Sequence, residues 1–243
     1  MRLLVSVADV EEAAAALAGG ADVIDAKDPQ AGALGPVPSR VLREIRAAVG
    51  DARPVTAAIG DASDEAALEA IAHEFASTGS TLLKVGFAGI DSAFRVSVLL
   101  DAAIRGASAA TEGLCGVIAV AYADPRCDCG IGVPRLFSTA ARAGARGVLV
   151  DTLDKSGPRL CQFATPLTLT RWVGEAHDLG LTVALAGRLT ADDLPLVRDA
   201  GADIAGVRGA ACEGGRTGRV SADRVRELSR LTGAPAPART LSK

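Results

Sequence analysis

The stretch Ala18-Gly19-Gly20-Ala21-Asp22-Val23-Ile24-Asp25-Ala26-Lys27 runs from the end of an Ala-rich helix through a glycine turn into an apolar strand. Similar turns precede two later apolar runs, at Ala143-Gly144-Ala145 and at Ala200-Gly201-Ala202-Asp203. Glycine commonly ends a helix, so each turn marks the junction of a helix with the next strand. The recurrence is a weak internal repeat of one helix–strand unit. It predicts a chain that alternates between the two elements.

The same alternation extends through the rest of the chain. The apolar runs lack the strict polar alternation of a half-exposed sheet, which favours parallel strands covered by helices. We predict strands at residues 2–7, 23–27, 54–59, 81–85, 114–121, 147–151, 181–186 and 203–207. We predict helices at residues 10–18, 39–49, 64–77, 92–104, 133–143, 167–179, 190–200 and 222–231.

Eight strand–helix units in about 230 residues match a (β/α)₈ TIM barrel in number and size. The alternative is a doubly wound open sheet, which normally carries a glycine-rich fingerprint after its first strand. The corresponding segment here, Val5-Ser6-Val7-Ala8-Asp9, contains no glycine. We therefore predict a single TIM-barrel domain over residues 1–231. The Pro- and Ala-rich tail, 232–243, is expected to be disordered.

The composition excludes several classes of protein. The chain of 243 residues has a net charge of −3, without the basic excess of a nucleic-acid-binding protein. It contains no apolar run of about 20 residues that could span a membrane, and its N-terminus lacks the layout of a signal peptide. Five cysteines, an odd number, favour reduced thiols and a cytoplasmic location. The oligomeric state is left open, a homo-oligomer included.

Lysine is rare in this chain. Only four of the 26 basic residues are lysines, namely Lys27, Lys84, Lys155 and Lys243, and the others are arginines. Arginine keeps its proton near neutral pH, whereas a lysine whose pKa is lowered can form an imine or act as a base. Three internal lysines retained against this bias indicate amine chemistry. The alternative is that they are ordinary salt-bridge partners.

Charged residues fall repeatedly where the predicted strands end, which in a barrel is the face that carries reactive groups. Asp25 and Lys27 are two residues apart and point to the same side of one strand. Lys84 lies near the end of the fourth strand, Asp151 ends the sixth, and Lys155 follows it. We expect these five side chains to converge as catalytic residues at the barrel mouth. Buried ion pairs closing the barrel are the alternative.

Glycine and arginine follow the last two predicted strands. Gly187 and Arg188 come after the seventh strand, and Arg208 and Gly209 come after the eighth. Glycines at these positions expose backbone N–H groups, which form the usual phosphate site of a TIM barrel, and either arginine could add a bidentate contact. We predict a phosphate site here, with two tight turns as the alternative.

No metal or other cofactor is expected. Cys127-Asp128-Cys129 has the wrong spacing for a zinc pair, and no second pair follows it. His73 and His177 lie within predicted helices, away from the strand ends.

Several motifs together resemble those of a known enzyme family, the (5-formylfuran-3-yl)methyl phosphate synthases, also called 4-(hydroxymethyl)-2-furancarboxaldehyde-phosphate synthases. The resemblance extends from Arg2 to about Leu231. The segments that carry it are Leu3-Leu4-Val5-Ser6, Asp9-Val10-Glu11-Glu12-Ala13, Gly19 to Pro29, Gly32-Ala33-Leu34-Gly35, Lys84-Val85-Gly86, Tyr122-Ala123-Asp124, Leu149 to Thr152 with Lys155, Ala184-Leu185-Ala186-Gly187 and Gly206 to Cys212.

The resemblance implies a TIM-barrel enzyme that condenses two molecules of glyceraldehyde 3-phosphate into a phosphorylated furan aldehyde, a precursor of a methanofuran-type one-carbon carrier. It implies that Lys27 forms the Schiff base and that Lys84 accepts a proton. It also implies that Asp25, Asp151 and Lys155 are further active-site groups. All five residues are present in this chain.

The residues themselves are compatible with such a reaction. An imine on Lys27 would acidify the neighbouring carbon, a neutral Lys84 would take its proton, and the enamine would attack the second aldehyde before phosphate leaves by β-elimination. Two other functions stay open on the residues alone. One is a lysine-dependent class I aldolase acting on another phosphorylated aldehyde, and the other is a non-catalytic barrel that binds phosphorylated metabolites.

Overall fold

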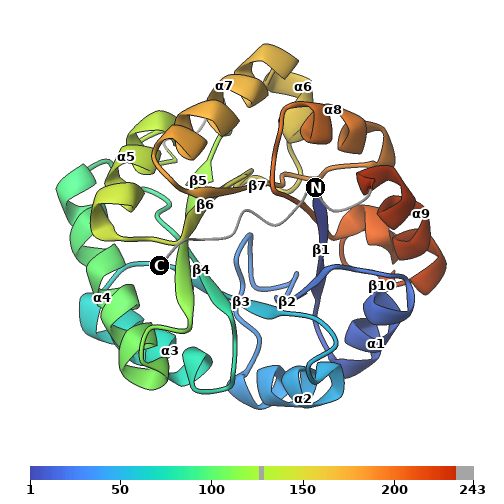
Figure 1. The fold of residues 1–243 in the computed structure, drawn as a ribbon, viewed down its shortest axis with the longest axis horizontal. Helices are drawn as coiled ribbons and strands as arrows, with labels where there is room; N and C mark the ends of the chain where they lie inside the picture. Colours follow the sequence, from blue (N-terminus) through green and yellow to red (C-terminus); the bar gives the residue numbers. More distant parts are fainter. Residues whose placement is uncertain (126–128, 234–243) are drawn as a thin grey trace.

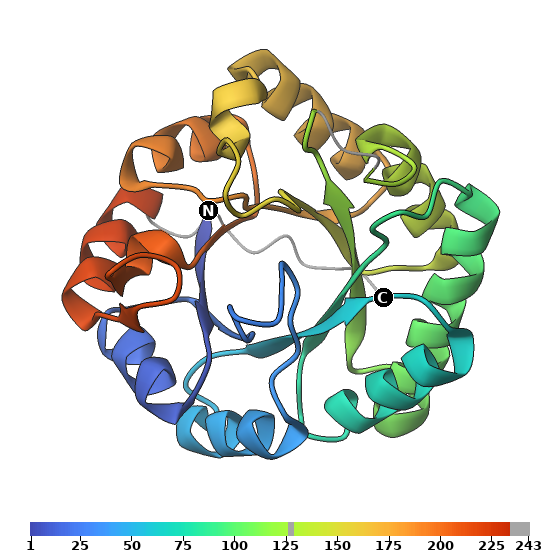
Figure 2. The ribbon, with the colours of Figure 1, turned by 180° about the vertical axis from the view of Figure 1, so that it is seen from behind.

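The computed structural model describes residues 1–125 and 129–233. Within these residues, eight parallel strands close into a barrel in sequence order, and helices surround it (Figures 1 and 2). The barrel closes where β1 pairs with β8, with Leu4 opposite Gly206. The predicted TIM barrel is therefore confirmed, and the open sheet is wrong.

The barrel strands lie close to their predicted positions. They are β1 (Arg2–Val7), β2 (Val23–Ala26), β3 (Val55–Asp61), β4 (Leu82–Gly86), β5 (Gly116–Tyr122), β6 (Gly147–Asp151), β7 (Thr182–Leu185) and β8 (Ile204–Val207). A short two-stranded sheet, β9 (Cys212–Glu213) and β10 (Arg219–Val220), lies between β8 and the last helix, where no strand was predicted.

The helices begin and end largely where the sequence predicts. They are α1 (Val10–Ala18), α2 (Ser39–Val49), α3 (Glu65–Ala76), α4 (Ala93–Thr111), α5 (Val133–Ala143), α6 (Leu160–Phe163), α7 (Pro166–Asp178), α8 (Leu194–Asp199) and α9 (Ala222–Thr232), with 3₁₀ turns η1 (Ala191–Asp193) and η2 (Gly209–Ala211). Asp9 caps α1, because its carboxylate accepts the N–H of Glu12 at 2.9 Å.

The largest difference from prediction is in α4, which continues to Thr111 instead of ending at residue 104. The predicted helix stops two residues before Gly106. In the structure Gly106 lies inside the helix, and a Cβ there would stand 2.2 Å from the carbonyl oxygen of Glu69 on α3. This glycine therefore serves the close packing of two helices, which no local pattern reveals.

Two further expectations concern the ends and the thiols. Helix α9 includes the buried Thr232, one residue beyond the predicted domain end, while residues 234–243 of the tail lie outside the described residues.

Cys115, Cys161 and Cys212 are free, but Cys129 is disulfide-bonded, so the expectation of reduced thiols throughout is wrong at Cys129. A cysteine count does not show which sulfur atoms come within bonding reach, because that depends on tertiary geometry.

No helix within the described ranges is long and apolar enough to cross a membrane.

Candidate active site

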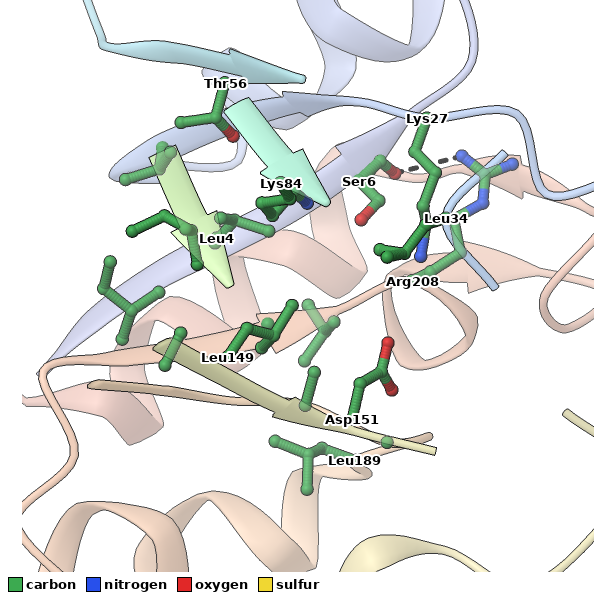
Figure 3. A pocket seen from close by; sticks show the side chains of 18 of the residues that line it. Leu4, Ser6, Lys27, Leu34, Thr56, Lys84, Leu149, Asp151, Leu189 and Arg208 are labelled. Atoms are coloured by element: carbon green, nitrogen blue, oxygen red, sulfur yellow. Dashed lines mark hydrogen bonds between the residues drawn. The ribbon is translucent and has the colours of Figure 1, made fainter. Parts of the chain in front are cut away.

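A cavity of about 650 Å³ occupies the barrel interior, and its lining extends from residues at the N-terminal ends of the strands, such as Arg2 and Thr182, to Lys27 and Asp151 at the C-terminal mouth. Barrels of eight strands are normally filled by bulky side chains. Here Ala184 on β7, Ala186 directly after it and Gly206 on β8 belong to the lining, and these residues fill little space. Lys27, Lys84 and Asp151 point into the same space in Figure 3.

Asp25 is the centre of a buried polar layer. Its carboxylate is fully buried and forms an ion pair of 2.5 Å with the amine of Lys84. The hydroxyl of Thr56 donates to it at 2.7 Å, and the hydroxyl of Ser6 donates at 2.9 Å. Four strands, β1 to β4, supply this layer, which is why residues far apart in sequence meet. A buried carboxylate with these three partners is fixed in place.

Asp151 forms a second lysine–aspartate pair. The amine of Lys155 lies 2.7 Å from its Oδ1, and the N–H of Thr152 donates to the same oxygen at 2.7 Å. Burial alone would raise the pKa of Asp151, but the charges of Lys155 and Lys27 and these hydrogen bonds lower it overall. The carboxylate therefore stays negative at the barrel mouth.

Lys27 differs from the other two lysines that line the cavity. Its side chain is only 7% exposed, and its amine forms no hydrogen bond or ion pair with any described residue. The pKa of Lys27 is lowered to about 7, chiefly by burial, while the charge of Asp151 opposes the change, those of Lys155 and Lys84 add to it and that of Asp25 opposes it. A large share of this amine is neutral, and hence nucleophilic, at neutral pH.

The five predicted catalytic residues thus converge at the barrel mouth. The structure also separates them into two ion pairs and one lysine outside these pairs. Asp25 with Lys84 and Asp151 with Lys155 form pairs, so the alternative of buried ion pairs describes four of the five residues. Lys27 stays outside both pairs. This asymmetry singles out one lysine by geometry, which the sequence alone could not do.

The predicted phosphate residues all line the cavity, but they differ in availability. Gly187 has a φ of +99°, which suits glycine. Arg188 is exposed and has a φ of +60°, a left-handed conformation that costs an ordinary residue roughly 1–2 kcal/mol. Gly209 begins the 3₁₀ turn η2. Gly187, Arg188 and Gly209 therefore surround one side of the mouth.

Arg208 is placed differently from expectation. All five N–H groups of its guanidinium donate within the protein, to both carboxylate oxygens of Glu12 and to the carbonyl oxygens of Ser6, Arg216 and Gly218. The side chain is 7% exposed. A bidentate phosphate contact would require breaking this buried pair, so Arg208 acts in the structure as a support of the loop after β8.

Tyr122 and Asp124 belong to a segment that carries the family resemblance, but neither was predicted as a site residue. The phenol of Tyr122, at the end of β5, donates to Asp61 at 2.9 Å, and burial raises its pKa. A Cβ on Gly86 would lie 2.1 Å from Asp61 Oδ1, so the glycine makes room for this contact. Asp124 accepts the N–H groups of Leu153 at 2.7 Å and of Asp154 at 3.0 Å and thereby fixes the loop that carries Lys155. Their signal was their position directly after a predicted strand.

Within residues 1–125 and 129–233, the structure contains no group of three or more His, Cys, Asp or Glu side chains arranged to hold a metal ion. Of Cys127-Asp128-Cys129, only Cys129 belongs to the described residues.

Two solved structures with the same fold superpose on nearly the whole chain. A 3-hexulose-6-phosphate synthase has a TM-score of 0.64 at 21% identity, covering 96% of this chain and 100% of that one. The phosphoribosyl anthranilate isomerase of Thermus thermophilus has a TM-score of 0.64 at 15% identity, covering 95% of this chain and 98% of that one. At such identities the likeness shows the fold alone.

Fold and site together define an enzyme of the (β/α)₈-barrel class, with its ionisable side chains at the C-terminal ends of the strands. The particular family follows from sequence comparison. A family model described as 4-HFC-P synthase matches residues 3–229, and the chain belongs to that family.

Curated relatives carry a single name. The (5-formylfuran-3-yl)methyl phosphate synthase of Methanocaldococcus jannaschii is 37% identical over 235 residues, covering 95% of this chain and 99% of the relative. The protein of the same name from Methanopyrus kandleri is 38% identical over 234 residues, covering 94% and 97%. The resemblance drawn from the motifs is therefore confirmed over nearly the whole chain.

Proposed function

We propose that this chain condenses two molecules of glyceraldehyde 3-phosphate to (5-formylfuran-3-yl)methyl phosphate through a Schiff base on Lys27. It would act in the cytoplasm as a carbon–oxygen lyase, in the biosynthesis of a methanofuran-type carrier. One observation carries the proposal: Lys27 is a buried amine without a hydrogen-bond or ion-pair partner among the described residues, it lies in the same cavity as two lysine–aspartate pairs, and its pKa is about 7. The name shared by the relatives supports the choice of product.

The first step is imine formation at Lys27. The neutral amine attacks the aldehyde carbon, and the resulting carbinolamine must lose its hydroxyl as water. Lys84 lies in the same cavity as an ammonium paired with Asp25, so it would donate the proton that this water takes away. Lys84 is left as a neutral amine beside a carboxylate that remains held by Ser6 and Thr56.

Lys84 would then act as the base. The protonated imine acidifies the neighbouring C–H, and the neutral amine of Lys84 takes that proton and returns to its ion pair with Asp25. The electron pair of the C–H bond becomes the enamine. This sequence lets one lysine serve first as acid and then as base, and the net proton count at Lys84 is zero.

The second pair, Asp151 with Lys155, would assist the loss of phosphate. The electron pair of the enamine expels one phosphate by β-elimination, which breaks its C–O bond, and the enol carbon that results forms the new carbon–carbon bond with the second triose. Lys155 can donate to the departing phosphate oxygen while Asp151 keeps the amine in position. The atoms balance when one inorganic phosphate and two waters leave and hydrolysis of the imine releases the furan. No oxidant is needed.

The phosphate that stays on the product would be held at the mouth beside β7 and β8. Gly187 and Gly209 offer backbone there, and the exposed guanidinium of Arg188 is free to turn toward an anion. Arg208 is left out of this contact because its N–H groups are already used.

At low pH, the pH–rate profile is expected to follow the titration of the Lys27 amine. The nucleophile is the neutral amine, so the initial rate should rise about ten-fold per pH unit below the pKa of about 7 and level off above it. Initial rates measured from about pH 5 to about pH 9, with circular dichroism at each pH as a control for folding, test this. A rate that still rises about ten-fold per pH unit up to about pH 9 would mean that Lys27 has an ordinary pKa.

The reaction itself is tested by a product assay. The purified protein is incubated with glyceraldehyde 3-phosphate alone, and products are followed by mass, ultraviolet absorbance and phosphate release. We expect a conjugated furan aldehyde phosphate with one phosphate released per furan. A non-aromatic aldol without phosphate release would instead support a class I aldolase. Absence of turnover by folded protein would support a phosphometabolite-binding barrel.

A further inference from the structure

The loop between β2 and α2 follows Lys27 directly and folds back over the barrel. It appears in blue near the centre of the ring in Figures 1 and 2. The N–H of Asp28 donates to the carbonyl oxygen of Gly35 at 2.9 Å, which brings the two ends of the loop together. Lys27 therefore directly precedes a loop whose two ends are hydrogen-bonded to each other, and the position of that loop determines how far water reaches Lys27.

Leu34 anchors the loop in the barrel mouth. Its side chain is 2% exposed and packs with Ala58, Ile118, Tyr122 and Leu149 from β3, β5 and β6. One of its methyl groups lies so close to Gly86 that a Cβ on that glycine would stand 2.9 Å from it. Leu34 also lines the same cavity as Lys27 (Figure 3). It thus supplies apolar surface that displaces water beside the reactive amines.

Arg216, from the loop after β8, binds the tip of this β2 loop. Its guanidinium donates to the carbonyl oxygen of Pro29 and, at 2.7 Å, to that of Gly32. These two carbonyls are three residues apart, and a planar guanidinium can bridge them, whereas an ammonium cannot do so in the same geometry. No other side chain of the described residues donates to either carbonyl.

Arg216 is itself held by the buried pair described above. The Nε of Arg208 donates to the carbonyl oxygen of Arg216 at 3.0 Å, and Glu12 on α1 binds the rest of the Arg208 guanidinium. Contacts therefore run from α1 through β8 to the tip of the β2 loop. This gives Arg208 a role although its N–H groups are not available to a ligand.

We propose that Arg216 is a positioning residue that, by bridging the carbonyls of Pro29 and Gly32, holds the β2 loop closed so that Leu34 shields the Lys27 amine from water. The inference rests on the proposed function, because it concerns the amine that the Schiff base uses. Opening of the loop would hydrate Lys27 and favour its charged, unreactive form.

The charges that face Lys27 set the background for any test. They are Asp25 on β2, Lys84 on β4, and Asp151 and Lys155 at the end of β6, while Arg159, Arg188, Arg208 and Arg216 also line the cavity. Removal of the Arg216 charge would by itself favour protonation of Lys27. Variants that keep the charge are therefore needed to separate loop position from electrostatics.

The test measures how Lys27 titrates, without using turnover. Acylation of Lys27 by acetic anhydride is followed by peptide mass spectrometry as a function of pH, and the midpoint reports the amine. We expect Arg216→Lys, which keeps the charge but loses the bridge, and Leu34→Ala, which alters no charge, each to raise the midpoint by about one unit. This change would lower the neutral fraction at pH 7 roughly five-fold.

Arg219→Met is the matched control. Arg219 lies in the same loop region but pairs with Asp9 and Glu11 on the surface, so its loss should leave the midpoint unchanged. If the Lys27 midpoint in both the Arg216→Lys and the Leu34→Ala variant equals that of the original chain, the inference is overturned, even if the product assay succeeds. If the midpoints shift but no furan forms, the positioning role stands and the proposed reaction fails.

Discussion

Replacement of Lys27 by arginine is expected to reduce furan formation by about 10³-fold or more. Arginine keeps a positive charge and a long side chain, but its guanidinium does not lose a proton near neutral pH and forms no imine. The site around it already holds two ammonium groups, on Lys84 and Lys155, each paired with an aspartate. Neither can replace Lys27 without leaving its carboxylate unpaired.

The measurement combines turnover with chemical trapping. Sodium borohydride added during turnover should attach substrate mass to Lys27 in the original chain and to no residue of the Lys27→Arg variant. Arg40→Lys is the control. It exchanges arginine for lysine at an exposed ion pair with Glu44, and Arg40 does not line the cavity. A Lys27→Arg enzyme with near-normal activity, or trapping at Lys84, would rule out the proposed imine.

Replacement of Asp25 by asparagine is expected to lower both stability and activity strongly. The carboxylate is fully buried and is the ion-pair partner of Lys84 at 2.5 Å, with Ser6 and Thr56 as donors. Asparagine leaves the Lys84 ammonium buried without a counter-charge, and breaking a buried pair in this way costs on the order of 3 kcal/mol. For a domain of this size, that loss lowers the melting temperature by roughly 10 °C.

A double variant separates the two effects. Asp25→Asn combined with Lys84→Met removes the unpaired charge. We therefore expect the melting temperature of the double variant to recover most of the decrease caused by Asp25→Asn. Activity should not return, because the proposed acid and base is gone. Recovery of both properties, or an Asp25→Asn variant as active as the original, would show that this pair has no part in catalysis.

Much of the site could be predicted because a parallel barrel converts sequence order into spatial order. Asp25, Lys84 and Asp151 each come near the end of an apolar run, and in a closed parallel sheet all such ends meet on one face. The small residues Ala184, Ala186 and Gly206 were visible in sequence too, but their effect on the interior was not, because a cavity depends on what fills it from every other strand.

Local patterns failed where a residue serves a distant neighbour. The helix predicted at residues 92–104 stops short of Gly106, yet this glycine lies inside α4 and lets α3 approach it. Arg208 was predicted to offer a bidentate phosphate contact because it follows the eighth strand beside Gly209. It binds Glu12, which is 196 positions away in the sequence. Pairs of residues so far apart produce no periodic pattern in the sequence.

The order of strands and helices, the rarity of lysine and the placement of five ionisable residues at strand ends were already determined by the sequence. They follow from hydrophobic pattern and composition, which act locally along the chain. Which lysine is free, which arginine is occupied and how the β2 loop shields Lys27 were decided only by the tertiary structure. The reason is physical: burial and ion pairing depend on atoms brought together from distant segments, and these interactions set the protonation state of an amine.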